Sequence, residues 1–301
     1  MMKTSERAVL VAGATGTVGG ATARELLARG ARIKALVRDP ARAAHLVGAE
    51  LVQGDLRDPA ALERALTGVH TAFYVSPHEP DEEELARAFT RACEGHGVRL
   101  VFVGVHMDGQ GRLLRALLRF YFGRLMPAYV PKLRLSERIR RSKTNAVVLM
   151  PTNYFDNDEL FEAELRQGTF VQPLNRAFNR VAVQDLAEVA AKVCMDRSFP
   201  PGAYPVVGPE SLDARACAAA WSRALGREVT YRDDARAFRA AVERTTRGKK
   251  TQDLLSSYAA ISRLELPTSP KALARTTALL GRPPTPYAEY VQARVRAWAE
   301  S

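Results

Sequence analysis

Three glycines near the start of the chain limit, more than any other feature, what the chain can fold into. The apolar, partly β-branched run Ala8–Ala12 leads into Gly13, Gly16 and Gly19, and a helical pattern follows at once. Glycine permits a tight turn and lets a bound anion come close to the backbone. A helix that starts there adds unpaired N–H groups and the positive end of its dipole. Strand, glycine loop and helix in this order predict a phosphate-binding loop for a dinucleotide.

Strand and helix patterns alternate as far as about residue 150. The runs predicted as buried strands are Ala8–Ala12, Ile33–Val37, Glu50–Gln53, Ala72–Val75, Leu100–Val105 and Ala146–Met150. Asp39–Pro40 and Asp58–Pro59 each place a capping carboxylate before a proline that suits the first helical position, and Gly30 suits the end of the helix after the loop. Parallel strands joined by helices cross over right-handed. The sequence therefore predicts an α/β fold with a doubly wound parallel Rossmann sheet.

The pattern changes after Met150. We expect a loop at Pro151–Asn157, a short helix at Glu159–Leu165, an irregular stretch at Gly168–Arg180, a helix at Gln184–Met195, a strand at Tyr204–Val207, and then mainly helices, broken at Gly226, Gly248 and Gly281. This predicts a Rossmann domain over residues 1–153, to which residues 181–207 return. A smaller, mainly helical substrate or cap region would comprise residues 154–180 and 208–301.

The net charge of +11 suggests nucleic acid as one class of partner. However, the basic residues are mixed with acidic ones, and the densest run, Arg134–Lys143, keeps Leu135 and Ile139 four residues apart. That spacing is typical of a surface helix with one buried face. We therefore expect no nucleic-acid partner, with direct binding through this helix as the alternative.

Cysteine usage and hydropathy narrow the class of protein further. Cys93, Cys194 and Cys217 lie far apart in apolar helical stretches, which predicts reduced core thiols and no metal site. The apolar runs are too short to cross a bilayer, and the N-terminal residues show no signal-peptide pattern. We therefore expect a cytoplasmic protein with no membrane partner.

The end of the second predicted strand indicates which dinucleotide is bound. An acidic residue there would accept hydrogen bonds from the ribose, whereas a cation would pair with a 2′-phosphate. Arg38 directly follows the apolar run, while Asp39 is already assigned as the helix cap before Pro40. The planar guanidinium suits a bidentate phosphate contact. We therefore predict that NADP(H) is preferred over NAD(H).

Several segments along the chain resemble the NmrA-like family of atypical short-chain dehydrogenase/reductases. They are Gly13–Gly19, Ala35–Pro40, Gln53–Leu56, Leu149–Asn157, Val181–Val189, Val207–Leu212 and Leu280–Pro284. These landmarks occur in the matching order and cover most of the chain. The resemblance implies an NAD(P)-binding Rossmann protein.

The resemblance also implies roles for individual residues. The cofactor-binding residues of the loop would be Gly13, Thr15, Gly16, Thr17, Val18 and Gly19. Asp55 and Leu56 would contact adenine, Val75 and Ser76 would line the nicotinamide-side ribose, and Pro151, Thr152 and Asn153 would lie near the nicotinamide. Tyr154 and Phe155 would contact substrate. Two alternatives stay open: Asp55 as the cap of a turn, and Tyr154 and Phe155 as packing aromatics.

The residues expected for proton transfer are incomplete. Short-chain dehydrogenases typically use a Tyr with a Lys four residues later, and this chain contains no Tyr-x-x-x-Lys. The nearest approach is Tyr129 with Lys132, one residue short and interrupted by Pro131. Some NmrA-like members that reduce substrates carry a lysine near this region without the tyrosine, so the resemblance implies Lys132 as a ribose ligand or proton-relay member. His106 stands after the fifth predicted strand, where such members often have a serine, and is the second catalytic candidate because it would titrate near neutral pH. An incidental loop histidine is the alternative for His106, and His78 is a further candidate.

Hydride transfer to an electron-poor acceptor needs no dedicated acid, because solvent can supply the proton. We therefore predict an NADPH-dependent reductase of a small, apolar quinone or enone, which transfers hydride directly without the usual Tyr/Lys pair. The alternative is a non-catalytic NAD(P)-sensing regulatory protein that acts through a protein partner. The oligomeric state stays open.

Overall fold

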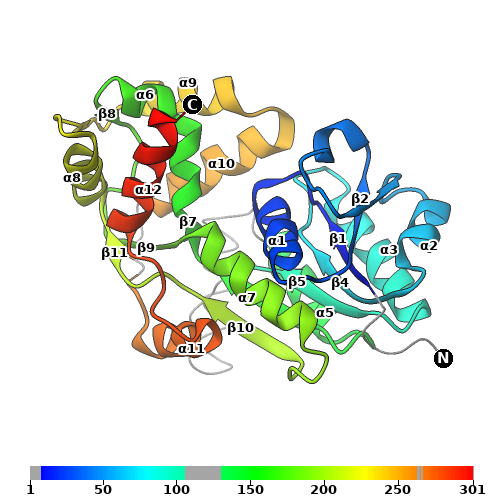
Figure 1. Ribbon diagram of the computed structural model, residues 1–301. Helices are drawn as coiled ribbons and strands as arrows, with labels where there is room; N and C mark the ends of the chain where they lie inside the picture. Colours follow the sequence, from blue (N-terminus) through cyan, green and yellow to red (C-terminus); the bar gives the residue numbers. More distant parts are fainter. Residues whose placement is uncertain (1–7, 106–129, 263–264, 266, 301) are drawn as a thin grey trace. The chain divides into compact units, whose positions relative to one another are not determined.

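The computed structural model describes residues 8–105, 130–262, 265 and 267–300. The chain divides into two compact units. The first comprises residues 1–106, 131–150 and 183–204, and the second comprises residues 107–130, 151–182 and 205–301. Figure 1 shows the elements of both units in the colours of the sequence.

The first unit is built on a seven-stranded sheet with the strand order β10-β6-β5-β4-β1-β2-β3. The strands are β1 (Ala8–Ala12), β2 (Ile33–Val37), β3 (Glu50–Gln53), β4 (Val69–Tyr74), β5 (Arg99–Val103), β6 (Val147–Pro151) and β10 (Gly202–Val206). The pairings from β3 across to β6 are all parallel. From β1 the strand order runs β1-β2-β3 in one direction, and from β4 it runs β4-β5-β6 in the other. The order therefore reverses between β1 and β4. This confirms the predicted doubly wound sheet and places its switch point there.

Helices connect the strands of this sheet. They are α1 (Thr17–Ala28), the 3₁₀ helix η2 (Pro40–Ala43), α2 (Pro59–Leu66), α3 (Glu82–Gly95), α5 (Val130–Arg140) and α7 (Val183–Met195). One face of the sheet packs α2, α3 and α5 into a single apolar core, to which α5 contributes Leu135 and Ile139. Helices α1 and α7 lie beside each other (Figure 1). Helices on both faces are what a parallel sheet requires, because its strands are apolar on both sides.

The predicted helix signals in the first unit are confirmed. Asp58 accepts a hydrogen bond from the Ala60 N–H before α2, and Asp39 accepts one from the Ala41 N–H before η2, which is a 3₁₀ rather than an α-helix. Gly30 adopts φ +75° directly after Arg29, the C-cap residue of α1. Leu135 and Ile139 are the buried residues of α5. Glu137 pairs with Arg140 and Arg141 on the exposed side of this helix.

The second unit is mainly helical around its own apolar core. Its elements are β7 (Asn153–Tyr154), η4 (Phe155–Phe161), α6 (Glu162–Arg166), β8 (Thr169–Phe170), β9 (Phe178–Val181), β11 (Ser211–Leu212), α8 (Ala214–Leu225), β12 (Thr230–Tyr231), α9 (Ala235–Thr245), α10 (Gly248–Ile261), α11 (Pro270–Leu280) and α12 (Tyr287–Ala299). Helices α8, α9, α10 and α12 bury their apolar residues together with those of η4 and β8.

Two sequence predictions for this unit need correction. The predicted loop Pro151–Asn157 contains β7, and the predicted irregular stretch Gly168–Arg180 contains β8 and most of β9. These strands are two to four residues long and pair with distant segments, so local periodicity does not reveal them. The helices are broken at Gly226, Gly248 and Gly281, as predicted. Gly226 and Gly281 end α8 and α11 in the left-handed conformation, and Gly248, with φ +58°, begins α10 after α9 has ended at Thr245.

Candidate cofactor-binding site

The glycine loop joins β1 to α1 through two close backbone approaches. Gly13 adopts φ +91°, which glycine tolerates best, and its carbonyl oxygen accepts a hydrogen bond of 3.0 Å from the Gly16 N–H. A Cβ on Gly19 would lie 2.1 Å from that same oxygen, so only glycine lets α1 pack this closely. A Cβ on Gly16 would lie 3.4 Å from its nearest neighbour in the protein. Gly13 and Gly19 are thus required by the protein's own backbone, whereas Gly16 is not.

The start of α1 is open to an anion. Gly16 is its N-cap residue, no side chain caps it, and no acidic residue lies in its first turn. Thr15, Gly16 and Thr17 are exposed, while Val18 and Gly19 are buried. An uncapped helix start presents N–H groups without intrahelical partners and the positive end of the dipole. These are the features with which a helix binds phosphate.

The loop lies at the switch point of the sheet. A Cβ on Gly13 would lie 3.6 Å from the Val75 carbonyl oxygen and 3.8 Å from the Val75 Cβ. Gly13 follows β1 and Val75 follows β4, so the two strand ends meet where the strand order reverses. Open α/β sheets bind their ligands at such a crevice.

Two arginines share one carboxylate beside the second and third strands. Arg38 follows β2, and its Nη1 lies 3.6 Å from Oε1 of Glu79. The other oxygen of Glu79 lies 3.8 Å from Nη2 of Arg57. Arg57 also donates to both oxygens of Asp81, at 2.8 Å each, which raises the pKa of Arg57 and lowers that of Asp81. Arg57 and Glu79 are absent from the sequence prediction because nothing local distinguishes them from surface charges.

Asp55 caps the turn in which it lies. Its Oδ1 accepts hydrogen bonds from the Arg57 N–H at 2.8 Å and from Arg57 Nη1 at 3.3 Å. This is the turn-capping role that the sequence left open as the alternative. Leu56 is partly buried against the core of the first unit. Contact of these two residues with adenine stays a prediction.

A buried carboxylate connects two of the predicted site residues. Ser76, just beyond β4, donates a hydrogen bond of 2.5 Å to Oε1 of Glu82. Nζ of Lys132 lies 3.9 Å from the same oxygen. Glu82, in the first turn of α3, is only 2% exposed. We refer to Ser76, Glu82 and Lys132 as the Glu82 cluster; the sequence predicts the first and last of these separately and misses Glu82.

The buried Tyr74 ends β4 near this cluster. Burial, together with the charges of Glu82 and Asp81, raises the pKa of its phenol, so Tyr74 stays neutral. The other predicted catalytic residue, His106, lies outside the described residues, as does Tyr129. His78 is exposed.

The segment after β6 is held in the second unit by side-chain hydrogen bonds. Thr152 donates to the Oδ1 of buried Asn179 at 3.0 Å, and Asn157 donates to the Oδ1 of Asn153 at 3.1 Å. Strand β7 pairs with β9 in parallel, with Asn153 opposite Arg180. Pro151 ends β6 and is buried. The side chains of Thr152 and Asn153 therefore support the fold of this segment, whatever they contact in a complex.

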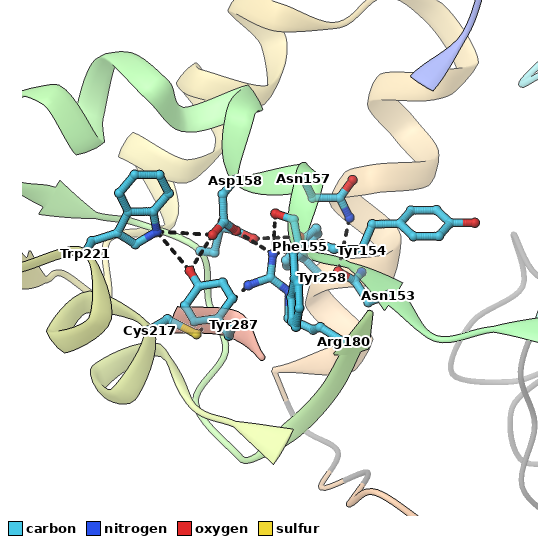
Figure 2. Close-up of polar contacts among 11 residues, drawn as sticks. Asn153, Tyr154, Phe155, Asn157, Asp158, Arg180, Cys217, Trp221, Tyr258 and Tyr287 are labelled. Carbon is cyan, nitrogen blue, oxygen red and sulfur yellow. Dashed lines mark hydrogen bonds and ion pairs between the residues drawn. The ribbon is translucent and has the colours of Figure 1, made fainter. Parts of the chain in front are cut away.

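Tyr154 and Phe155 point in different directions. In Figure 2 the ring of Tyr154 extends away from Arg180, while the ring of Phe155 lies against it. Phe155 is 1% exposed and packs edge-on against Tyr287, with a ring-centroid distance of 5.0 Å. The structure thus gives Phe155 the packing role that was the alternative to substrate contact. Tyr154 is only partly buried.

A fully buried ion pair fixes the backbone at this point (Figure 2). Nη2 of Arg180 donates to Asp158 and to the carbonyl oxygens of Tyr154, at 2.8 Å, and Phe155, at 3.1 Å. Arg180 comes from β9 and Asp158 from η4, and both side chains are at most 2% exposed. Although burial opposes its charge, Asp158 raises the pKa of Arg180, so the guanidinium stays protonated.

Asp158 accepts further hydrogen bonds from three other parts of the second unit. Its Oδ1 accepts one from Gln172 at 2.6 Å, and its Oδ2 accepts one from Trp221 at 3.2 Å and another from the Tyr287 hydroxyl. Tyr258 donates to Gln172 at 2.7 Å. Helices α8, α10 and α12 are thereby tied to η4 and β9. The sequence analysis contains no sign of this network, because its members are 14 to 129 residues apart.

The predicted core thiols are confirmed. Cys93, Cys194 and Cys217 are free and buried. Burial raises the pKa of Cys93 and of Cys217 to about 12, so both are poor nucleophiles at neutral pH. Within the described part of the chain, no group of three or more His, Cys, Asp or Glu residues is arranged to hold a metal ion. Among the same residues, no helix is long and apolar enough to span a membrane.

Comparison with known proteins identifies the family. The model of the NAD(P)H-binding family matches residues 13–197. An NAD(P)H azoreductase from Xenophilus azovorans is 31% identical over 227 residues, which cover 74% of this chain and 76% of that protein. A (4-alkanoyl-5-oxo-2,5-dihydrofuran-3-yl)methyl phosphate reductase from Streptomyces griseus is 32% identical over 232 residues, which cover 75% and 76%.

Solved structures agree on the fold. An NADPH-dependent quinone oxidoreductase from Escherichia coli, in complex with NADPH, superimposes with a TM-score of 0.75. The match covers 95% of this chain and 99% of that chain, with 23% sequence identity.

The chain belongs to the NAD(P)H-binding family of Rossmann proteins. The predicted resemblance to NmrA-like atypical short-chain dehydrogenase/reductases is confirmed. The predicted class, an NAD(P)H-dependent oxidoreductase, is confirmed as well.

The Asp158 network leads to a prediction about stability. Asp158→Asn would leave the buried Arg180 guanidinium without its counter-charge, so we expect the free energy of unfolding to fall by about 3 to 5 kcal/mol. Urea unfolding of the purified variant measures this. The matched control is Glu162→Gln in the exposed pair with Arg166, which should cost less than about 1 kcal/mol. Equal effects of the two substitutions would contradict the importance of the buried pair.

Proposed function

We propose that the protein is an NADPH-dependent reductase that transfers a hydride to a small, apolar, electron-poor acceptor of the quinone or enone type. The observation that carries this proposal is a chemical property common to the relatives' substrates. The names of the three proteins compared above describe an azo group, a ring C=C conjugated with carbonyl groups, and a quinone. Each has an electron-poor π bond that accepts a hydride directly.

The missing acid fits this class of acceptor. When a quinone or an enone takes up a hydride, the negative charge that forms is delocalised, and solvent can protonate it later. A simple ketone would instead form an alkoxide that needs a nearby acid. The chain contains no Tyr-x-x-x-Lys motif to supply one. We therefore propose that the protein's main part in the reaction is to bind and orient the reactants and to exclude water, and that proton transfer through His106 or Lys132 is an aid rather than a requirement.

The proposed cofactor is NADP(H) rather than NAD(H). When bound, it supplies the hydride from its reduced nicotinamide. The uncapped start of α1 suits its pyrophosphate, and the exposed guanidinium of Arg38 suits the 2′-phosphate. Glu79, the present partner of Arg38, carries one negative charge, so a doubly charged phosphate would compete well for the same arginine.

We assign the remaining positions by role. Asp55 and Leu56 would face adenine, and Val75 and Ser76 would line the nicotinamide-side ribose. Pro151, Thr152 and Asn153 would lie by the nicotinamide. Tyr154 is the proposed substrate contact in the second unit, and His106 and Lys132 are the candidates for proton transfer. The alternative of a non-catalytic sensor with a protein partner loses support, because the curated relatives compared above are reductases by name.

A panel of acceptors tests the proposed reaction. We expect the purified protein to oxidise NADPH with at least one of a menadione-type quinone, an acyl butenolide and an azo dye. Oxidation with cyclohexanone should be about 100-fold slower or absent, because general acid catalysis of that order is missing. Absorbance at the NADPH band gives the rates. Tight NADPH binding without turnover of any activated acceptor would contradict the proposal and favour the sensor.

Substitution of Arg38 tests the cofactor preference. Arg38→Ala should raise KM for NADPH about 10- to 100-fold, as expected for the loss of hydrogen bonds to a charged group, and should leave KM for NADH unchanged. Arg91→Ala removes the same charge from an exposed position on α3 and should change neither KM. If Arg38→Ala raises KM for NADPH and for NADH equally, Arg38 does not bind the 2′-phosphate.

A further inference from the structure

We propose that Glu82 is a positioning residue for the cofactor: it holds the Lys132 ammonium and the Ser76 hydroxyl in place for the nicotinamide-side ribose. This inference rests on the proposed function, because it assumes that NADPH binds at the edge of the sheet beyond β1 and β4. Glu82 itself would not touch the ribose or the nicotinamide.

The three members of the Glu82 cluster come from three elements of the first unit. Ser76 follows β4, Glu82 lies in the first turn of α3, and Lys132 lies in the first turn of α5. One oxygen, Oε1 of Glu82, is 2.5 Å from the Ser76 hydroxyl and 3.9 Å from the Lys132 ammonium. A single carboxylate oxygen therefore accepts a hydrogen bond from one side chain and attracts the charge of the other.

The burial of Glu82 is not explained by the needs of α3. Carboxylates in the first turn stabilise a helix through its dipole, and Glu83 and Glu84 also lie in that turn. Glu84 is exposed and Glu83 only partly buried, whereas Glu82 is 2% exposed. Burying a carboxylate carries a desolvation cost that pairing and hydrogen bonds must offset. The helix start would be equally well served without this cost, so the burial of Glu82 points to the side chains that it holds.

Lys132 is fixed at its backbone as well as at its ammonium. The Ser136 hydroxyl donates to the Lys132 carbonyl oxygen at 2.8 Å. Ser136 in turn packs on Gly104, where a Cβ would lie 2.6 Å from the serine Oγ and 3.0 Å from Cγ1 of Val148. The absence of a side chain at position 104 thus lets α5 approach the ends of β5 and β6 closely. With its backbone held by Ser136 and its ammonium attracted to Glu82, Lys132 has less rotational freedom to lose when it binds a ligand.

The remaining chemistry of the cluster suits a sugar hydroxyl. The Lys132 ammonium, which lies 3.9 Å from Glu82, is a hydrogen-bond donor, and a serine hydroxyl that donates to Glu82 still has lone pairs that accept. A vicinal diol presents both donors and acceptors. The cluster therefore offers donors and acceptors that complement a ribose. The negative charge of Glu82 would contact Ser76 and Lys132 but not the ribose itself. Without that charge, Lys132 would lose the attraction between its ammonium and Glu82.

A double-mutant cycle with two ligands tests this inference. Glu82→Gln keeps the shape and an acceptor for Ser76 but removes the charge that holds Lys132. We expect the dissociation constant for NADPH to rise about tenfold or more. The dissociation constant for 2′,5′-ADP, which lacks the nicotinamide ribose, should not change. Lys132→Met should have the same selective effect, and adding Glu82→Gln to Lys132→Met should weaken NADPH no further.

The control is Glu84→Gln in the same helical turn, which should leave both dissociation constants unchanged. Equal weakening of 2′,5′-ADP and NADPH by Glu82→Gln would show a merely structural role and overturn the inference. Fully additive effects of Glu82→Gln and Lys132→Met would overturn it too, as would unchanged NADPH binding. If Glu82→Gln does not fold, a Lys132→Met protein that binds NADPH as tightly as the wild type overturns it independently. A wild-type protein that binds neither ligand would instead refute the proposed function itself.

Discussion

Gly19 lies so close to the carbonyl oxygen of Gly13 that a single methyl group at position 19 would stand 2.1 Å from it. This contact brings the first turn of α1 against the loop that leaves β1, and it does so without any side-chain cap. Because β1 pairs with both β4 and β2, the same contact also fixes the position of the start of α1 relative to the ends of those two strands. The groups assigned to the pyrophosphate, the 2′-phosphate and the ribose all depend on that arrangement.

In the second unit the backbone is positioned by side chains rather than by a close backbone contact. There a charged pair, Arg180 with Asp158, is enclosed among aromatic side chains, and Arg180 also holds the carbonyl oxygens of Tyr154 and Phe155. Alternate residues then face opposite ways, so Phe155 enters the core while Tyr154 does not. A buried pair of this kind defines the position of a segment more than it stabilises the fold, because desolvation offsets most of its attraction.

The features predicted correctly from the sequence are those with local causes. The strands β1, β2 and β3, the caps at Asp39 and Asp58, and the left-handed Gly30 follow from residues within one or two turns of each other. The Glu82 cluster does not, because Lys132 is 50 residues from Glu82, and a glutamate that starts a helix gives no sign of burial. The same holds for Asp158 and for strands as short as β8. The sequence could name Ser76 and Lys132 as separate candidates, but only the fold shows the carboxylate between them.

A substitution at Gly16 tests most directly whether this loop binds the dinucleotide. It has an ordinary backbone conformation, φ −93°, and a Cβ there would meet the protein only at 3.4 Å. Gly16→Ala should therefore leave the thermal unfolding temperature unchanged but weaken NADPH binding about tenfold or more, since the methyl group would stand where the pyrophosphate approaches. Gly95→Ala, whose Cβ would meet nothing within 4 Å, is the control and should leave binding unchanged. An unaltered NADPH dissociation constant in folded Gly16→Ala protein would contradict the account.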